Sequence, residues 1–190
     1  MILQATSVLS PSDKGSLLLN TPALIIRELV EQGAVMLSMA EPSSEVLQRL
    51  SEVVDCPLPE HAGKTTERAM RRALWLSPRH RLLMCDPTDE VELVNVVKDA
   101  FPDATAHAAM YSDALCWLEL CGTHALEALQ QGGFVRIGDE FPQHFGKRTT
   151  LFEVPVLLLR DEQYQIAVER SRADYLLQRL EQLTFLETAL

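Results

Sequence analysis

The sequence predicts an α+β protein of two lobes, each an antiparallel sheet covered by helices. Short β-like apolar runs alternate with amphipathic helical segments along the chain. Across residues 33–110 they follow the order β-α-β-β-α-β, which is the order of a ferredoxin-like unit. The order nearly repeats across residues 111–190, which we expect to form the second α/β lobe. Residues 1–32 are then an N-terminal arm or strand that packs on the second lobe.

The N-terminal arm carries weak local signals. Pro11–Gly15 is typical of a loop, and Leu17–Leu19 fits a short strand. The apolar stretch Thr21–Val30 fits either a helix or a strand.

The first lobe opens with a strand at Ala34–Met39. Pro42-Ser-Ser then starts a helix, because proline tolerates the first helical turn and serine caps exposed N–H groups. Its apolar positions recur at helical spacing: Val46, Leu47, Leu50, Val53 and Val54. Cys56–Pro59 ends this helix, and residues 60–70 are predicted to be a surface loop.

Strands at Ala73–Leu76 and Arg81–Cys85 follow, joined by a tight turn at Ser77–His80. Asp86-Pro87 begins the next helix, and a strand around Thr105–Met110 completes the lobe. The side of this helix that we expect to be buried consists of Val91, Val94, Val97 and Phe101.

The second lobe begins with a strand at Ala114–Cys121. Thr123 is expected to cap a helix that carries Ala125, Leu126 and Leu129. Gly132-Gly133 is expected to end it with a positive φ, and Phe134–Ile137 to be extended.

A long strand at Thr150–Leu159 is predicted to form a hairpin with Tyr164–Val168 through Asp161–Gln163. Pro155 lacks an N–H donor, so its strand should be at a sheet edge or bulged there. Ser171–Asp174 fits a capping box that opens a last helix. The apolar side of that helix is Leu176, Leu177, Leu180 and Leu183.

Charge argues against nucleic-acid binding. The chain has 27 acidic and 17 basic side chains, a net charge of −10 that would repel a phosphate backbone. No segment has the ~20 continuous apolar residues of a membrane helix. The N-terminus also lacks the basic and apolar regions of a signal peptide, so we expect a cytoplasmic protein.

The cysteines and histidines form one candidate metal cluster, Cys116, Cys121 and His124. Tetrahedral zinc needs a fourth ligand, and none is near in sequence. Together with the absence of CxxC spacing, this favours reduced, buried thiols, including Cys56 and Cys85, and a surface histidine.

Catalytic motifs are missing as well. The sequence has no GxSxG, HExxH, GxGxxG or GxxxxGK pattern. Trp75 and Trp117 lie in strands and are interpreted as core or interface anchors. Four acidic residues fit the first turn of a helix, where the dipole favours anions: Asp86, Asp89, Glu90 and Glu92. The sequence therefore predicts no catalytic, cofactor-binding or metal-binding residues.

Several short motifs occur in an order that resembles one known family. They are Leu58-Pro59, Ala73-Leu-Trp-Leu-Ser-Pro78 with Arg81-Leu-Leu, Tyr111-Ser-Asp113 leading to Trp117-Leu-Glu-Leu-Cys-Gly122, Phe141-Pro-Gln-His-Phe-Gly146 with Lys147-Arg-Thr149, and Arg170-Ser171. This ordered set, spanning residues 33–183, resembles the gamma subunit of heterotetrameric sarcosine oxidase. The chain departs from the family pattern at Ala114, at Thr123-His124 and by two extra residues before Gly146.

The resemblance implies a fold related to the folate-binding aminomethyltransferase superfamily. It implies that FAD, FMN, NAD and tetrahydrofolate belong to larger flavoprotein partner subunits, and that this chain supports assembly without catalysis. The departures leave the substrate open between sarcosine, N-methylglutamate and dimethylglycine. The N-terminal arm and Phe134–Gly146 are the expected contact surfaces. The alternative is a stand-alone folate- or pterin-binding protein, with Glu119 and Asp113 as the nearest carboxylates for the pterin ring.

Overall fold

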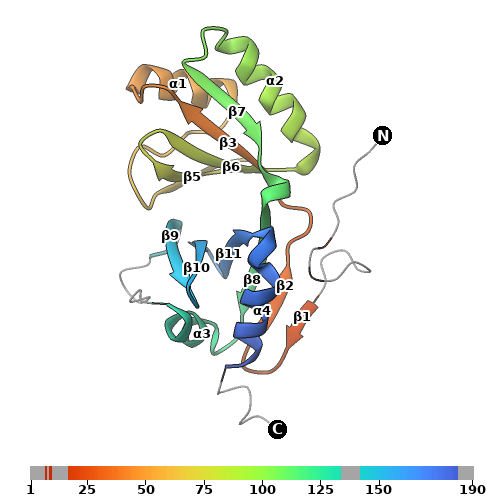
Figure 1. Cartoon of the computed structure of the whole chain (residues 1–190). Coiled ribbons are helices and arrows are strands. Elements are labelled where there is room, and N and C mark those ends of the chain that lie inside the picture. Colours follow the sequence, from red (N-terminus) through yellow and green to blue (C-terminus); the bar gives the residue numbers. More distant parts are fainter. Residues whose placement is uncertain (1–6, 8, 10–16, 134–141, 184–190) are drawn as a thin grey trace. The chain divides into compact units, whose positions relative to one another are not determined.

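The computed structural model describes residues 7, 9, 17–133 and 142–183, which fall into two compact units (Figure 1). Gln32–Asp113 with His144–Lys147 form the central unit. The terminal unit takes its described residues from the ranges Met1–Glu31, Ala114–Gln143 and Arg148–Leu190. Each unit is an antiparallel sheet with helices, so the predicted α+β class is confirmed.

The central unit has a ferredoxin-like sheet with one additional strand. Its strands are β3 (Gly33–Met39), β4 (Thr65–Arg68), β5 (Arg71–Ser77), β6 (His80–Cys85) and β7 (Ala106–Met110). They lie in the order β4-β5-β6-β3-β7, and all four neighbouring pairs are antiparallel. Without β4, this is the arrangement that a β-α-β-β-α-β unit produces.

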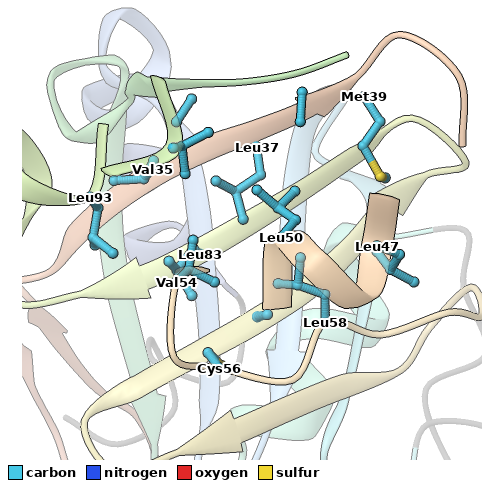
Figure 2. Close-up of a cluster of buried hydrophobic side chains, with 14 of the residues drawn as sticks. Val35, Leu37, Met39, Leu47, Leu50, Val54, Cys56, Leu58, Leu83 and Leu93 are labelled. Atoms are coloured by element: carbon cyan, nitrogen blue, oxygen red, sulfur yellow. The ribbon is translucent and has the colours of Figure 1, made fainter. Parts of the chain in front are cut away.

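Helix α1 (Ser44–Val53) forms where its sequence predicts. The Ser43 side chain accepts a hydrogen bond from the Val46 amide at 3.2 Å, which satisfies one of the free N–H groups at the helix start. Leu47 and Leu50 are buried in a cluster that also contains Leu37 and Leu83 from the sheet (Figure 2). This cluster is the hydrophobic core between the helices and one face of the central sheet.

Helix α2 (Glu90–Ala100) buries most of the side that was expected, since Val97 and Phe101 are in the core cluster and Val94 packs against it, but Val91 is an exception. Val91 is 59% exposed, whereas Leu93 is 2% exposed and lies in the core cluster with Val97. A 3₁₀ turn, η1 (Pro87–Asp89), precedes the helix. The core-facing side of the helix runs through Glu90, Leu93 and Val97, and Val91 lies outside it.

Residues 60–70 are not entirely a loop, because they contain β4. This strand pairs with β5 in the register Thr65↔Leu74 to Arg68↔Arg71. It is the outer strand of the sheet and is half to fully exposed. An edge strand needs no apolar alternation, which explains why its polar sequence resembles a loop.

The terminal unit has a six-stranded sheet in the order β1-β2-β8-β11-β10-β9. Its strands are β1 (Leu17–Asn20), β2 (Ile25–Glu28), β8 (Leu115–Cys121), β9 (Phe145–Leu151, of which the part from Arg148 belongs to this unit), β10 (Val154–Arg160) and β11 (Tyr164–Glu169). The helices are α3 (Ala125–Gly132) and α4 (Ala173–Glu181). The ambiguous stretch 21–30 therefore contains a strand, β2, which pairs antiparallel with β8.

The predicted long strand at 150–159 is two strands. Phe152 and Glu153 have φ values of 48° and 67° and form the tight turn between β9 and β10. Consequently β10 lies between β9 and β11, and Pro155 is not on a sheet edge. The pairing of β10 with β11 starts at Val156↔Val168, one residue after Pro155. The missing N–H of the proline therefore removes no hydrogen bond between these two strands.

The predicted helix ends of the terminal unit are partly wrong. Residue His124, not Thr123, occupies the start of α3, and no side chain caps it. Gly133 is extended at φ −129°, so a positive φ does not end the helix. Gly132 instead accommodates the ring of Phe152, since an added Cβ would lie 2.5 Å from Phe152 Cε2.

Helix α4 also starts without the predicted capping box. A 3₁₀ turn, η3 (Arg170–Arg172), precedes it, and Arg172 occupies the cap position with no side-chain hydrogen bond. Its apolar side is buried as expected: Leu176, Leu177, Leu180 and, beyond the helix end, Leu183. The expected extended segment Phe134–Ile137 lies outside the described residues.

Candidate functional site

The central unit contains an open pocket of about 240 Å³ beside the start of α1. Its lining comes from β3, the start of α1, the segment before β4, and β5 and β6 with their turn. The lining residues are Met39, Pro42, Ser43, Ser44, Leu47, Glu60, His61, Trp75, Pro78 and Arg81. The pocket thus combines apolar walls with polar groups of both charges.

Arg81 is the buried charge of this pocket, with 3% of its surface exposed. Its Nε donates to the Pro59 carbonyl at 2.6 Å, and Nη1 donates to the Ser77 carbonyl at 2.6 Å. Nη1 also reaches the carbonyls of Pro78 at 3.3 Å and His80 at 3.0 Å. The guanidinium lies 5.8 Å from the centroid of the Trp75 ring, within cation–π range.

The electrostatics of Arg81 are those of a buried cation without an ion pair. Burial lowers the pKa of its guanidinium, and the negative charge of Glu60 partly opposes that shift. Among the described residues, no carboxylate lies within salt-bridge distance of Arg81. Backbone carbonyls therefore provide its stabilisation.

The sequence contained only a weak signal for this pocket. Arg81 stands next to the apolar run Leu82-Leu-Met-Cys85, all of which is buried. An arginine near the start of a strand whose later residues are all buried could have pointed to this pocket. Arginine is rarely buried unless its charge is paired, so such a position suggests a special environment. Trp75, predicted as a core or interface anchor, lines the pocket, whereas Trp117 is buried in the core of the terminal unit.

The candidate metal cluster does not assemble. Cys116 and Cys121 are separated by an odd number of positions on β8, so their side chains point to opposite faces of the sheet. Cys116 Sγ lies 3.6 Å from a carboxylate oxygen of Glu28, and Cys121 Sγ lies 3.9 Å from one of Glu119. Within residues 7, 9, 17–133 and 142–183, no His, Cys, Asp or Glu group has the geometry of a metal site.

The four cysteines are free thiols, and burial raises the pKa of each of them. The pKa is about 12 for Cys85 and about 12 for Cys116, where the neighbouring carboxylates Glu90 and Glu28 add to the effect of burial. These thiols are therefore protonated at neutral pH and are poor nucleophiles.

The acidic residues around the start of α2 have separate roles. Asp86 accepts a hydrogen bond from the Thr88 amide at 2.8 Å, and Asp89 pairs with Arg71 at 3.2 Å. Glu90 differs from them because it is buried and accepts a hydrogen bond from the Ser112 hydroxyl. The helix-start interpretation thus holds for all four, because Asp86 caps η1, Asp89 lies in η1, and Glu90 and Glu92 lie in the first turn of α2; Glu90 is in addition buried.

The two carboxylates considered for a pterin ring lie in different environments. Glu119 on β8 forms an ion pair with Arg27 on β2 at 3.5 Å and is mostly buried. Asp113 lies in η2 (Ser112–Ala114), the 3₁₀ turn that follows β7. The Glu119–Arg27 pair links two neighbouring strands of the terminal sheet.

Comparison with solved structures identifies the fold. The chain is similar to a chain of heterotetrameric sarcosine oxidase from Corynebacterium sp. U-96, with a TM-score of 0.76 and 23% identity over 86% of this chain and 85% of that one. It is also similar to glycine cleavage system aminomethyltransferase T from Bartonella henselae, with a TM-score of 0.60 and 12% identity. That match covers 82% of this chain and 44% of the other, so this chain spans less than half of the aminomethyltransferase.

The chain therefore has the fold shared by these two proteins, as the sequence resemblance implied. No family model matches the sequence. No curated protein matches it either. In the described part of the chain, no helix combines the length and hydropathy needed to cross a bilayer.

Proposed function

We propose that this chain is the non-catalytic gamma subunit of a heterotetrameric, sarcosine oxidase-like flavoenzyme. The observation that carries the proposal is the likeness to a chain of that complex over 86% of one polypeptide and 85% of the other. Sharing an architecture over most of both lengths favours a subunit of similar size. The aminomethyltransferase match leaves more than half of the longer enzyme without a counterpart.

The motifs behind the sequence resemblance lie at structurally demanding positions, which supports the same proposal. Ala73–Pro78 forms most of β5 and enters its turn, and Trp117–Gly122 ends β8 at a glycine with φ +110°. Phe145, in the Phe-Pro-containing motif, lies against Gly63, where an added Cβ would approach its ring to 2.0 Å. Short motifs with such roles change little without damage to the fold.

In the proposed complex, this chain assembles and stabilises larger flavoprotein subunits. The oxidative demethylation of sarcosine, or of a related N-methyl amino acid, takes place on those partners. FAD, FMN, NAD and tetrahydrofolate are bound by them, and this chain contributes no cofactor ligand. The Glu119–Arg27 ion pair is consistent with that division, since it occupies Glu119 in a link between strands.

Affinity purification from the source organism tests the proposal. The tagged full chain should retain larger subunits whose visible spectrum contains flavin bands. Anaerobic addition of sarcosine, N-methylglutamate or dimethylglycine should bleach those bands, and the substrate that does so identifies the reaction. A colourless chain that elutes without larger subunits contradicts the proposal.

A stand-alone folate- or pterin-binding protein is the second candidate, favoured by the aminomethyltransferase fold. It requires that the isolated chain bind folate, which calorimetry and a thermal-shift assay measure directly. Saturable binding that Glu119→Gln abolishes would support it. If folate produces neither a heat of binding nor a thermal shift, the folate-binding candidate is excluded and the subunit proposal is unaffected.

A further inference from the structure

The pocket of the central unit contains a cation that the assembly role does not explain. Arg81 is 3% exposed and makes no ion pair within the described residues. Burying an arginine without a carboxylate costs free energy that four hydrogen bonds to carbonyls offset only in part. An anion in the pocket would supply the missing partner.

The guanidinium keeps donors available for such an anion. All four of its hydrogen bonds use Nε and Nη1. Nη2 has no hydrogen-bond partner among the described residues and belongs to a side chain that lines the pocket. An arginine with one nitrogen free and the others fixed is pre-organised to bind an oxyanion.

The start of α1 provides a second source of positive potential at the same pocket. Pro42, Ser43 and Ser44 line it, and Ser43 Oγ already accepts from the Val46 amide. The amides of Ser44 and Glu45 have no acceptor within the helix, because the first N–H groups of any α-helix lack one. These amides and the helix dipole favour a bound anion.

The remaining walls determine what kind of anion fits. Met39, Leu47, Trp75 and two prolines are apolar, so the ligand needs an apolar body as well as its charge. A volume of about 240 Å³ restricts it to a small molecule. Glu60 and His61 are exposed at the pocket, and the Glu60 carboxylate weakens anion binding without blocking the pocket.

We propose that this pocket binds a small monocarboxylate with an apolar or aromatic body. The carboxylate contacts Arg81 Nη2 and the first amides of α1, and the body packs against Trp75, Met39 and Leu47. The site belongs to the central unit alone. The proposed binding can therefore be tested independently of the proposed subunit role.

The test uses the full chain, benzoate as the probe and benzamide as its uncharged isostere. Benzoate should shift the Trp75 indole resonance in NMR spectra saturably, while benzamide at the same concentrations should not. Assignment of the two indole resonances with Trp75→Phe separates this signal from that of Trp117. Equal binding of benzamide, or shifts confined to Trp117, would overturn the proposal.

Two variants test whether the carboxylate of the ligand lies at the start of α1. Both leave Arg81 in place, because its hydrogen bonds hold the surrounding loops. Ser44→Asp adds a negative charge at the first position of α1, where it favours the helix and repels a carboxylate. It should weaken benzoate binding about tenfold or more. Asn95→Asp adds the same charge on an exposed position of α2, outside the pocket, and should leave binding unchanged.

Glu60→Gln should tighten benzoate binding severalfold, because it removes the one carboxylate that lines the pocket. Circular dichroism and thermal unfolding confirm that each variant is folded. Benzoate affinity that is equal in Ser44→Asp and Asn95→Asp would show that the carboxylate is not bound at the start of α1. Weaker binding of benzoate to Glu60→Gln than to the parent chain would likewise contradict the binding of a carboxylate in this pocket.

Discussion

The Ser112 hydroxyl donates a hydrogen bond to the Glu90 carboxylate, although the two residues are 22 positions apart. The same hydroxyl accepts from the Ala34 amide at 2.7 Å, so one serine links the start of α2 to the start of β3. Glu90 is only 4% exposed. Burial raises the pKa of its carboxyl, while the hydrogen bonds from Ser112 and Ala34 oppose the shift.

The raised pKa of Glu90 predicts a pH-dependent stability. The folded state holds this proton more tightly than the unfolded state, whose glutamate has the ordinary pKa of about 4.5. Glu90 therefore makes its full contribution to stability at pH values below the unfolded pKa. That contribution declines as the pH rises through the folded pKa. Glu90→Gln should remove this decline, as urea unfolding at several pH values would measure.

Glu92→Gln is the matched control for that experiment, because it makes the same charge change on an exposed position of α2. Its stability should follow that of the parent chain across the pH range. Parallel curves for the parent chain and Glu90→Gln would contradict the prediction.

The orientation of α2 predicts opposite outcomes for two neighbouring substitutions. Leu93→Ala deletes a fully buried side chain and should lower the free energy of unfolding by about 2–4 kcal/mol. Val91→Ala removes an exposed side chain and should change it by no more than about 0.5 kcal/mol. Chemical denaturation measures both, and a larger loss for Val91→Ala than for Leu93→Ala would contradict the observed burial of these two residues.

Gly122 should tolerate no side chain. Its φ of +110° disfavours L-residues, and an added Cβ would lie 2.6 Å from the Ala23 carbonyl oxygen. Gly122→Ala should cost about 2–3 kcal/mol of stability. Gly133→Ala is the comparison, because Gly133 is extended and its nearest contact would be 3.1 Å to a flexible leucine side chain. Equal unfolding midpoints for the two variants would refute this difference.

The thiols predict slow modification of the folded protein. Cys56, Cys85 and Cys116 are buried, and only Cys121 is partly exposed. At pH 8 a disulfide reagent such as Ellman's should react with no more than one thiol in the native state and with all four after denaturation. Cys121→Ser should abolish the native reaction; rapid labelling of Cys116 would contradict its pKa of about 12.

Several elements could be predicted from local sequence because their causes are local. Ser43 and the apolar spacing of α1 act within a few residues, and so does the leucine face of α4. The same reasoning correctly anticipates the β-α-β-β-α-β order of the central unit. It fails at β4, whose polar residues are strand only because β5 pairs with them.

The sequence by itself determined the α+β class, most helix and strand positions and the net charge of −10. The tertiary structure alone decided that Leu93 rather than Val91 is buried on α2, that the Phe152 ring leaves no room for a side chain at Gly132, and that β2 pairs with β8. It also placed Arg81 beside Trp75 and the start of α1, which lies about forty positions earlier. The physical reason is that periodicity and capping act over one or two helical turns, whereas packing and pockets depend on residues that only folding brings together.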